Sequence, residues 1–142
     1  MKIFNFIFSI IIVLIFWSCQ STLETDEGNH FSLEGTEWKL AGMVDAQTGV
    51  LKELEPKDCD ECYTLNFDTD STAFGISIAN YLGVKLRPIF QFNVMTEIYD
   101  SYIGDAAFFY QSIQSLISYE LNKNELKFYY NDNKNYLLFK PL

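Results

Sequence analysis

Basic residues are scarce in this chain of 142 residues, which has 10 Lys and Arg against 19 Asp and Glu and a formal net charge of −9. Nucleic acid is therefore excluded as an expected partner, because phosphate backbones are bound through basic patches. The same deficit argues against electrostatic docking to anionic lipid. An acidic surface of this kind chiefly favours solubility.

Histidine and cysteine are also scarce, with one His and three Cys. His30 lies in a polar stretch, where a catalytic base would lack the partner that orients it. A zinc site built on Cys59 and Cys62 would need two more ligands, and the chain offers only His30 and Cys19 for that role. We therefore expect no catalytic residue, no metal and no cofactor. An enzyme whose site is assembled from distant segments is the alternative.

The sequence also lacks an apolar run of about 20 residues, the length that a transmembrane helix needs. Residues 3–17 are almost entirely apolar, but at about 1.5 Å per residue they are short for a hydrocarbon core of roughly 30 Å. Lys2 precedes this leader, and Ser18 and Cys19 follow it. The layout is typical of a secretory signal whose cleavage site is a cysteine. It resembles a bacterial lipoprotein signal, in which the cysteine thiol takes a diacylglycerol and becomes the new N-terminus.

This resemblance implies that residues 1–18 are a lipoprotein signal peptide and that Cys19 is the lipidation site. Two or three acyl chains, such as palmitate, would make attachment to the membrane lasting, whereas one chain holds only reversibly. Gln20 follows the cysteine, and by resemblance to the sorting rules of enteric bacteria it favours the outer membrane, on its periplasmic or surface face. A permanent single-span anchor and an ordinary signal peptide that leaves Cys19 as a thiol are the alternatives.

The rest of the chain divides into a tether and one domain. Residues 19–32 are polar and acidic without an apolar period, which indicates an acidic flexible tether. Residues 33–142 are long enough for one domain with a core of its own.

Alternation of apolar and polar residues dominates this domain and predicts β-strands. Asp105 can act as the N-cap of a helix whose apolar residues recur at helical spacing up to Leu116. We predict a mainly β fold, a small antiparallel barrel or sandwich of about seven to nine strands with one short helix near 105–116. The predicted strands are 36–44, 50–54, 63–67, 72–77, 81–86, 91–98, 117–121, 126–130 and 136–140.

Three segments of the domain resemble a known group of proteins. Residues 33–40, 62–68 and 125–140, with Trp38 in the first, are similar to small lipocalin-like, META-domain-type lipoproteins of Bacteroidetes. The resemblance implies a compact β-barrel-like fold with one helix. The shared motifs are structural, so no site residue is implied by them.

Cys59 and Cys62 form the sharpest local motif, within Asp58-Cys59-Asp60-Glu61-Cys62. A disulfide between them would suit an oxidising compartment. Free structural thiols, or a redox or metal pair, are the alternatives. The neighbouring carboxylates oppose a redox role, because a reactive thiolate needs a cationic environment.

The remaining candidate residues are isolated. Asp68 and Asp70 resemble part of a calcium loop but fit a plain turn better. Arg87 could bind a ligand carboxylate or form a surface ion pair.

The predicted function is that of a lipid-anchored, non-enzymatic envelope protein, a binding module for a small ligand or a partner protein. A structural or assembly role without a small ligand is the alternative. A void behind Trp38 and Phe128 would favour ligand binding, and a filled interior would favour assembly.

Overall fold

The computed structural model describes residues 31–96 and 103–142. The predicted signal peptide, Cys19, His30 and most of the predicted tether lie outside the described residues. The described elements are β1 (Glu37–Asp45), β2 (Leu51–Lys52), β3 (Thr64–Phe67), β4 (Thr72–Ile76), β5 (Tyr81–Lys85), β6 (Gln91–Val94), α2 (Ala106–Gln114), β7 (Ser118–Asn122), β8 (Glu125–Tyr130) and β9 (Asn135–Pro141).

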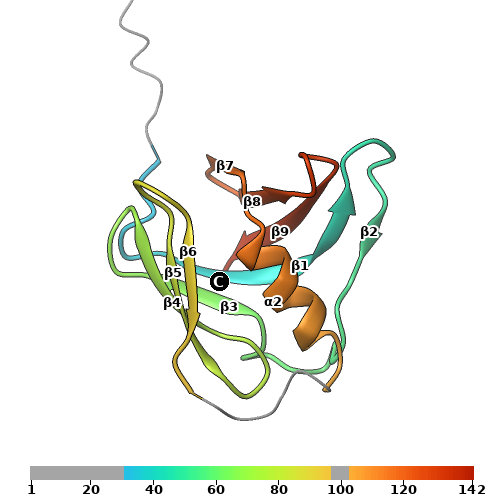
Figure 1. The fold of residues 1–142 in the computed structure, drawn as a ribbon, viewed down its shortest axis with the longest axis horizontal. Coiled ribbons are helices and arrows are strands. Elements are labelled where there is room, and N and C mark those ends of the chain that lie inside the picture. The colour runs from blue at the N-terminus through green and yellow to red at the C-terminus, as the bar shows by residue number, and fades with distance from the viewer. Residues whose placement is uncertain (1–30, 97–102) are drawn as a thin grey trace, which may run out of the picture. The chain divides into compact units, whose positions relative to one another are not determined.

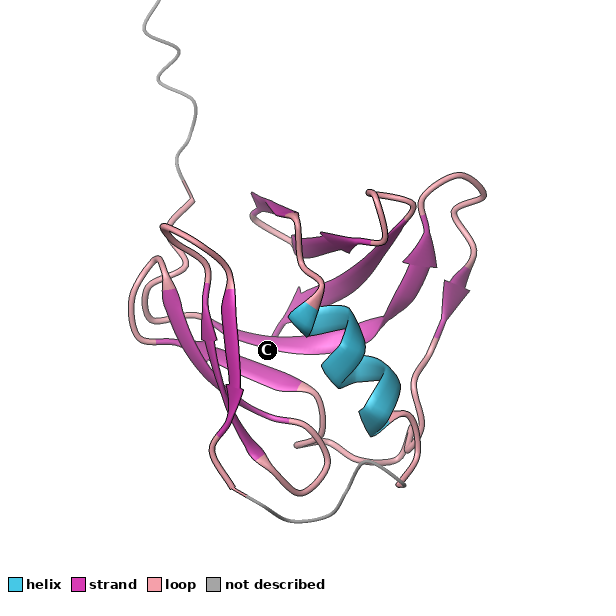
Figure 2. Ribbon diagram, in the orientation of Figure 1, coloured by secondary structure: helices cyan, strands magenta, loops and turns pink. Residues whose placement is uncertain are grey.

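The nine described strands form one antiparallel sheet in the order β6-β5-β4-β3-β1-β9-β8-β7, with β2 paired to β1 outside this path. The sheet curls around α2, as Figures 1 and 2 show. Its end strands β6 and β7 are not paired with each other within the described part of the chain, so the sheet is a half-barrel. The predicted mainly β fold with one short helix is confirmed. The sequence left open whether the sheet forms a barrel or a sandwich, and the structure has a single curled sheet that is not closed.

β1 is the central strand because it pairs with β2, β3 and β9. Its side chains alternate between the core and the outer face, with Trp38, Leu40 and Val44 buried. A bulge between Leu40 and Gly42 shifts the register against β9. β2 then passes close over Gly42, where a Cβ atom would lie 2.5 Å from the Lys52 carbonyl oxygen. Bulges of this kind bend a strand and increase its twist, which suits a curled sheet.

α2 packs its apolar side against the concave face of the sheet. Phe109 and Ile113 are buried, and the Phe109 ring lies 4.9 Å from that of Tyr63, measured between centroids. Asp105 is the N-cap residue, but its side chain makes no capping hydrogen bond. Its carboxylate instead accepts from the Glu55 backbone N–H at 2.9 Å, and the Asp105 N–H donates to the Glu55 carbonyl at 2.8 Å. The predicted N-cap position is therefore confirmed, but the Asp105 side chain ties the helix start to the loop after β2 instead of capping the helix.

Most predicted strands occur within a residue or two of their expected ends, and four differences are informative. β2 is shorter than 50–54, and β6 ends at Val94 rather than at 98. Ile117 is 48% exposed, because β7 begins one residue later. Leu137, Leu138 and Phe139 are all buried in succession on β9, where β9 faces the β1 bulge that interrupts strict alternation.

Candidate functional site

The interior of the half-barrel is filled by side chains. Trp38 is 3% exposed, and its indole N–H donates to the Thr36 hydroxyl at 2.7 Å. Phe128 is fully buried, with its ring centroid 5.4 Å from Phe139 and 6.4 Å from Tyr119. These rings occupy the place where a ligand cavity would have to lie. The aromatic residues thus build the core, and a candidate site has to be sought on the outer face of the sheet.

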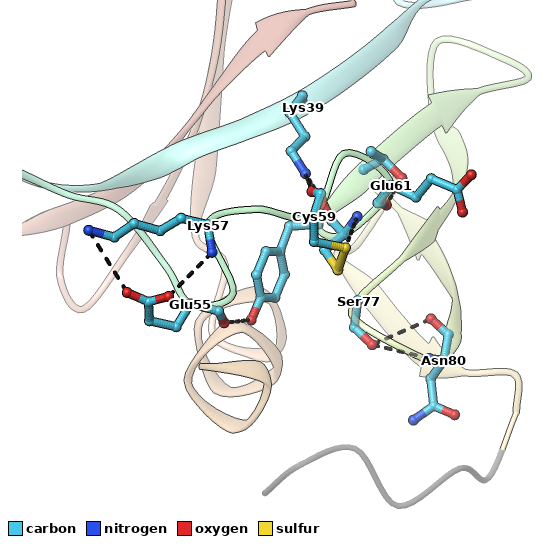
Figure 3. Close-up of a disulfide and its surroundings, with 10 residues drawn as sticks. Lys39, Glu55, Lys57, Cys59, Glu61, Ser77 and Asn80 are labelled. Atoms are coloured by element: carbon cyan, nitrogen blue, oxygen red, sulfur yellow. Dashed lines mark hydrogen bonds and ion pairs between the residues drawn. A yellow bond between two sulfur atoms is a disulfide. The ribbon is translucent and has the colours of Figure 1, made fainter. Parts of the chain in front are cut away.

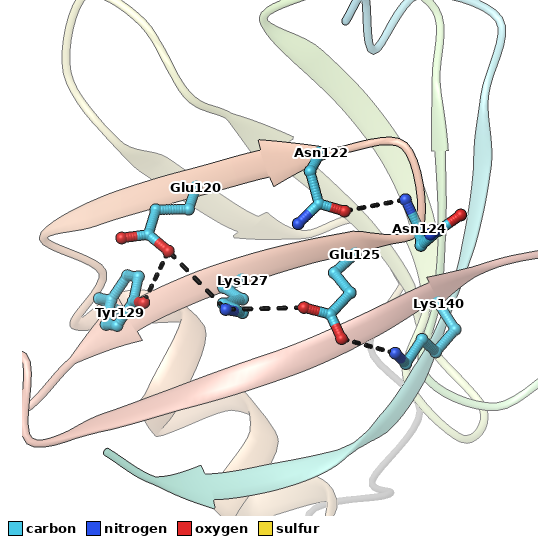
Figure 4. A network of polar contacts seen from close by, with 7 residues as sticks. All are labelled: Glu120, Asn122, Asn124, Glu125, Lys127, Tyr129 and Lys140. Carbon is cyan, nitrogen blue, oxygen red and sulfur yellow. Dashed lines mark hydrogen bonds and ion pairs between the residues drawn. The ribbon is translucent and has the colours of Figure 1, made fainter. Parts of the chain in front are cut away.

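The outer face over β7, β8 and β9 carries a ladder of charges that satisfy one another (Figure 4). The Lys127 ammonium lies 3.9 Å from Glu120 and 3.6 Å from Glu125, and Lys140 donates to Glu125 at 2.7 Å. The Tyr129 hydroxyl donates to Glu120 at 2.9 Å. Burial, and then this bond, raise the pKa of Tyr129 to about 12. Since these charges are already paired, the ladder offers little to a ligand.

The outer face over β3, β4 and β5 is different, because large apolar side chains are exposed there. Phe74 is 53% and Tyr81 is 58% exposed. Ile76 faces Tyr81 across the β4–β5 pair, which makes Phe74 a diagonal neighbour of Tyr81 on the same face. Together with Leu142 these side chains line a groove of about 360 Å³, which we call the outer-face groove. Exposed apolar patches of this kind commonly mark binding surfaces.

Acidic and amide side chains complete the outer-face groove. Glu37, Asp60 and Glu61 contribute three carboxylates, and no Lys or Arg is among the lining residues. The Asn66 amide donates to the Glu37 carboxylate at 2.7 Å, so two groove residues hold each other in position. β1, β3, β4 and β5 thus supply the floor, and the loop before β3 supplies the acidic rim. Two larger hollows lie elsewhere. One, of about 460 Å³, has a mixed apolar and polar lining that includes Trp38 and Leu142, and the other, of about 540 Å³, is lined mainly by charged residues.

The loop that carries Asp60 and Glu61 is held from two sides (Figure 3). The Sγ atoms of Cys59 and Cys62 are bonded, with the two Cα atoms 5.4 Å apart. The Lys39 ammonium donates to the Cys59 carbonyl at 2.6 Å and also to the Cys62 carbonyl. Burial lowers the pKa of Lys39, although Asp60 acts in the opposite direction. The rim is therefore anchored to β1 by a cation that is committed to backbone carbonyls.

The isolated candidates of the sequence have structural roles. The Asp70 carboxylate accepts hydrogen bonds from the Ser32 hydroxyl at 2.8 Å and the Leu33 N–H at 2.7 Å. Asp68 accepts from the Thr72 hydroxyl at 2.6 Å, so both carboxylates serve the turn and its surroundings. Arg87 donates to the Tyr119 hydroxyl at 2.6 Å and lies over its ring.

Within residues 31–96 and 103–142, no group of three or more His, Cys, Asp or Glu is placed to hold a metal ion. The same residues include no helix with the length and apolar character needed to cross a membrane. The predicted lipidation site, Cys19, lies outside them. Phe74 and Tyr81 were not among the predicted site residues, although the alternation in β4 sets Phe74 and Ile76 on the face opposite the small Ala73 and Gly75.

Comparison with known proteins identifies a relative of this chain. A Tannerella forsythia protein named "Putative lipoprotein" is 44% identical over 108 residues, which cover 76% of this chain and 74% of the relative. The chain belongs to the family of this Tannerella protein. No described protein-family model matches the chain.

Two solved structures share the fold of this family member. One is the NMR structure of a Burkholderia xenovorans protein, with a TM-score of 0.56 and 16% identity over 78% of this chain and 83% of that one. The other is the crystal structure of a DUF4847 family protein from Bacteroides vulgatus, with a TM-score of 0.56 and 15% identity over 76% and 93% of the two chains. At such identities the likeness concerns the fold alone. The resemblance to lipocalin-like, META-domain-type proteins stays a prediction.

Proposed function

We propose that the protein is a lipoprotein of the cell envelope, anchored through acyl chains on Cys19 after removal of residues 1–18. The observation that carries this proposal is the apolar leader ending at Ser18-Cys19, in a chain whose relative is named a lipoprotein. Gln20 favours the outer membrane as the place of attachment. The polar segment 19–32 would hold the domain away from the lipid surface.

Intact mass of the protein purified from the membrane fraction tests this anchor. We expect the mass of residues 19–142 plus a diacylglycerol and, where present, a third acyl chain. The Cys19→Ser variant should lack that addition and leave the membrane fraction. A wild-type protein that sediments with the membrane at the mass of the uncleaved, unacylated residues 1–142 would show a transmembrane anchor instead. The same spectrum reports whether Cys59 and Cys62 lack two hydrogens, as the proposed disulfide requires.

We further propose that the domain is a binding module without enzymatic activity and that its site is the outer-face groove. Support comes from the exposed rings of Phe74 and Tyr81, which lie in a hollow of about 360 Å³, within the range of about 300–1,000 Å³ typical of ligand sites. The filled interior gives no support to a ligand inside the half-barrel.

A fragment screen by NMR tests the binding role. Small aromatic compounds and sugars that bind should shift the backbone amide signals of Phe74, Gly75 and Tyr81, and Phe74→Ala should abolish those shifts. Shifts confined to the ladder of β7, β8 and β9 would place the site elsewhere. Complete absence of shifts would favour the alternative function, an assembly role without a small ligand. The filled interior around Phe128 supports that alternative.

A further inference from the structure

The outer-face groove has the chemistry of a receptor for a positively charged group. Its lining includes the carboxylates of Glu37, Asp60 and Glu61 and no cation. The nearest cation on the outer side of β1, Lys39, offsets part of the charge of Asp60, but its ammonium is held by the carbonyl oxygens of Cys59 and Cys62. Lys85 on β5, a diagonal neighbour of Phe74, is not among the lining residues. The charged lining residues are therefore all acidic, in a chain whose formal net charge is −9.

The aromatic rings of the groove can add a second attraction for a cation. An ammonium or guanidinium placed over the face of Phe or Tyr is attracted by the electrons of the ring. The structure already uses this contact elsewhere, with Lys127 lying 5.5 Å from the ring centroid of Tyr136. Within the described residues, the rings of Phe74 and Tyr81 make no ring–ring or cation–π contact, so both are available to a ligand.

We propose that the outer-face groove binds a basic side chain, lysine or arginine, presented by an extended peptide segment of a partner protein in which apolar side chains flank the cation. The apolar flanks would pack on Phe74, Ile76 and Leu142, and the cation would meet the acidic rim. Charge complementarity selects this occupant over an acidic or a neutral one. The inference rests on the binding role proposed for the groove and names its partner chemistry.

Calorimetric titration of the full chain in a nonionic detergent tests the proposal. The probe is a capped five-residue peptide with one lysine between two leucines, and the matched peptides replace that lysine by glutamine or glutamate. The lysine peptide should bind at least tenfold more tightly than the glutamine peptide at low salt. Its advantage should shrink as the ionic strength rises, because exposed charges are screened.

Variants separate a local effect from a general charge effect. The triple substitution Glu37→Gln, Asp60→Asn and Glu61→Gln should weaken the lysine peptide about tenfold, since each exposed pair contributes little and every tenfold is about 1.4 kcal/mol. The control removes the same charge at three residues that do not line the groove, with Glu53→Gln, Glu120→Gln and Asp132→Asn. It should weaken binding of the lysine peptide less than twofold.

Each result has one meaning. An equal loss in the two triple variants would overturn the proposal, because attraction would then follow net charge alone. Equal binding of all three peptides, abolished by Phe74→Ala, would overturn the preference for a cation while leaving the groove a binding site. If none of the peptides binds at millimolar concentration, the inferred partner chemistry is wrong, and the fragment screen alone decides the binding role.

Discussion

Gly104→Ala should destabilise the domain more than any other glycine substitution outside the sheet. Gly104 has a φ of +52°, and a Cβ atom there would lie 2.2 Å from the Glu55 carbonyl oxygen and 2.6 Å from its carbon. These are backbone atoms, so no side chain can rotate away. The same carbonyl accepts the Asp105 N–H, and any shift of the loop would also disturb the start of α2.

Two other glycines separate the cost of the positive φ from the cost of the clash. Gly35 and Gly49 have φ values of +73° and +72°, and a Cβ atom at either would meet nothing within 4 Å. Alanine in the left-handed region costs about 1–2 kcal/mol, and overpacking adds about 1–3 kcal/mol. We therefore expect a loss of about 1–2 kcal/mol for Gly35→Ala and Gly49→Ala and about 2–5 kcal/mol for Gly104→Ala.

Urea unfolding followed by near-ultraviolet circular dichroism measures these differences, because the buried aromatic rings report on tertiary packing. The slope with urea should be the same in all variants, so that the midpoints give the change in free energy of unfolding. A Gly104→Ala protein as stable as Gly35→Ala would refute the reasoning, since it would show that the loop after β2 can move aside at no cost.

Three further predictions concern the core, the helix and the charge ladder. Phe128→Ala should cost about 3–5 kcal/mol in the same urea experiment, because the fully buried ring leaves a cavity; a loss below 1 kcal/mol would contradict the filled interior. Asp105→Ala should cost about 1 kcal/mol by leaving the Glu55 N–H without its acceptor, and Asp105→Asn should recover part of it. The raised pKa of Tyr129 favours the neutral phenol in the folded state, so stability should be unaffected below pH 10 and should fall between pH 10 and about 12. Tyr129→Phe should remove that part of the alkaline slope, and an unchanged slope would disprove the assignment to Tyr129.

Much of the fold could be predicted from local pattern. Trp38 and Leu40 alternate with the charged residues Glu37 and Lys39. This period of two identifies a half-buried strand wherever one face meets a core. The turn after β8 could also be predicted, because Asn131 and Asp132 tolerate the positive φ values that they adopt there. Both signals depend only on neighbouring residues.

Other features depended on contacts between distant segments. The sequence showed that Asp105 suits a helix start, but not that Glu55, 50 residues earlier, would take its carboxylate. The outer-face groove could not be predicted from the sequence for the same reason. Its lining residues come together only after β1, β3, β4 and β5 have paired, as with Glu37, Asn66, Phe74 and Tyr81. The anchoring of the domain stays a prediction from the leader and Cys19.

The hydrogen bonds around Asp70 also set how the domain would respond to traction. Ser32, Leu33 and Glu34 all donate to this one carboxylate, and the Gly35 N–H donates to the Phe67 carbonyl at 2.8 Å. A mechanical force applied to the backbone at residue 31 would therefore act on several hydrogen bonds at once, rather than breaking them one after another. If the domain is anchored through Cys19 as proposed, these hydrogen bonds would resist mechanical force at the point where the chain enters the folded domain.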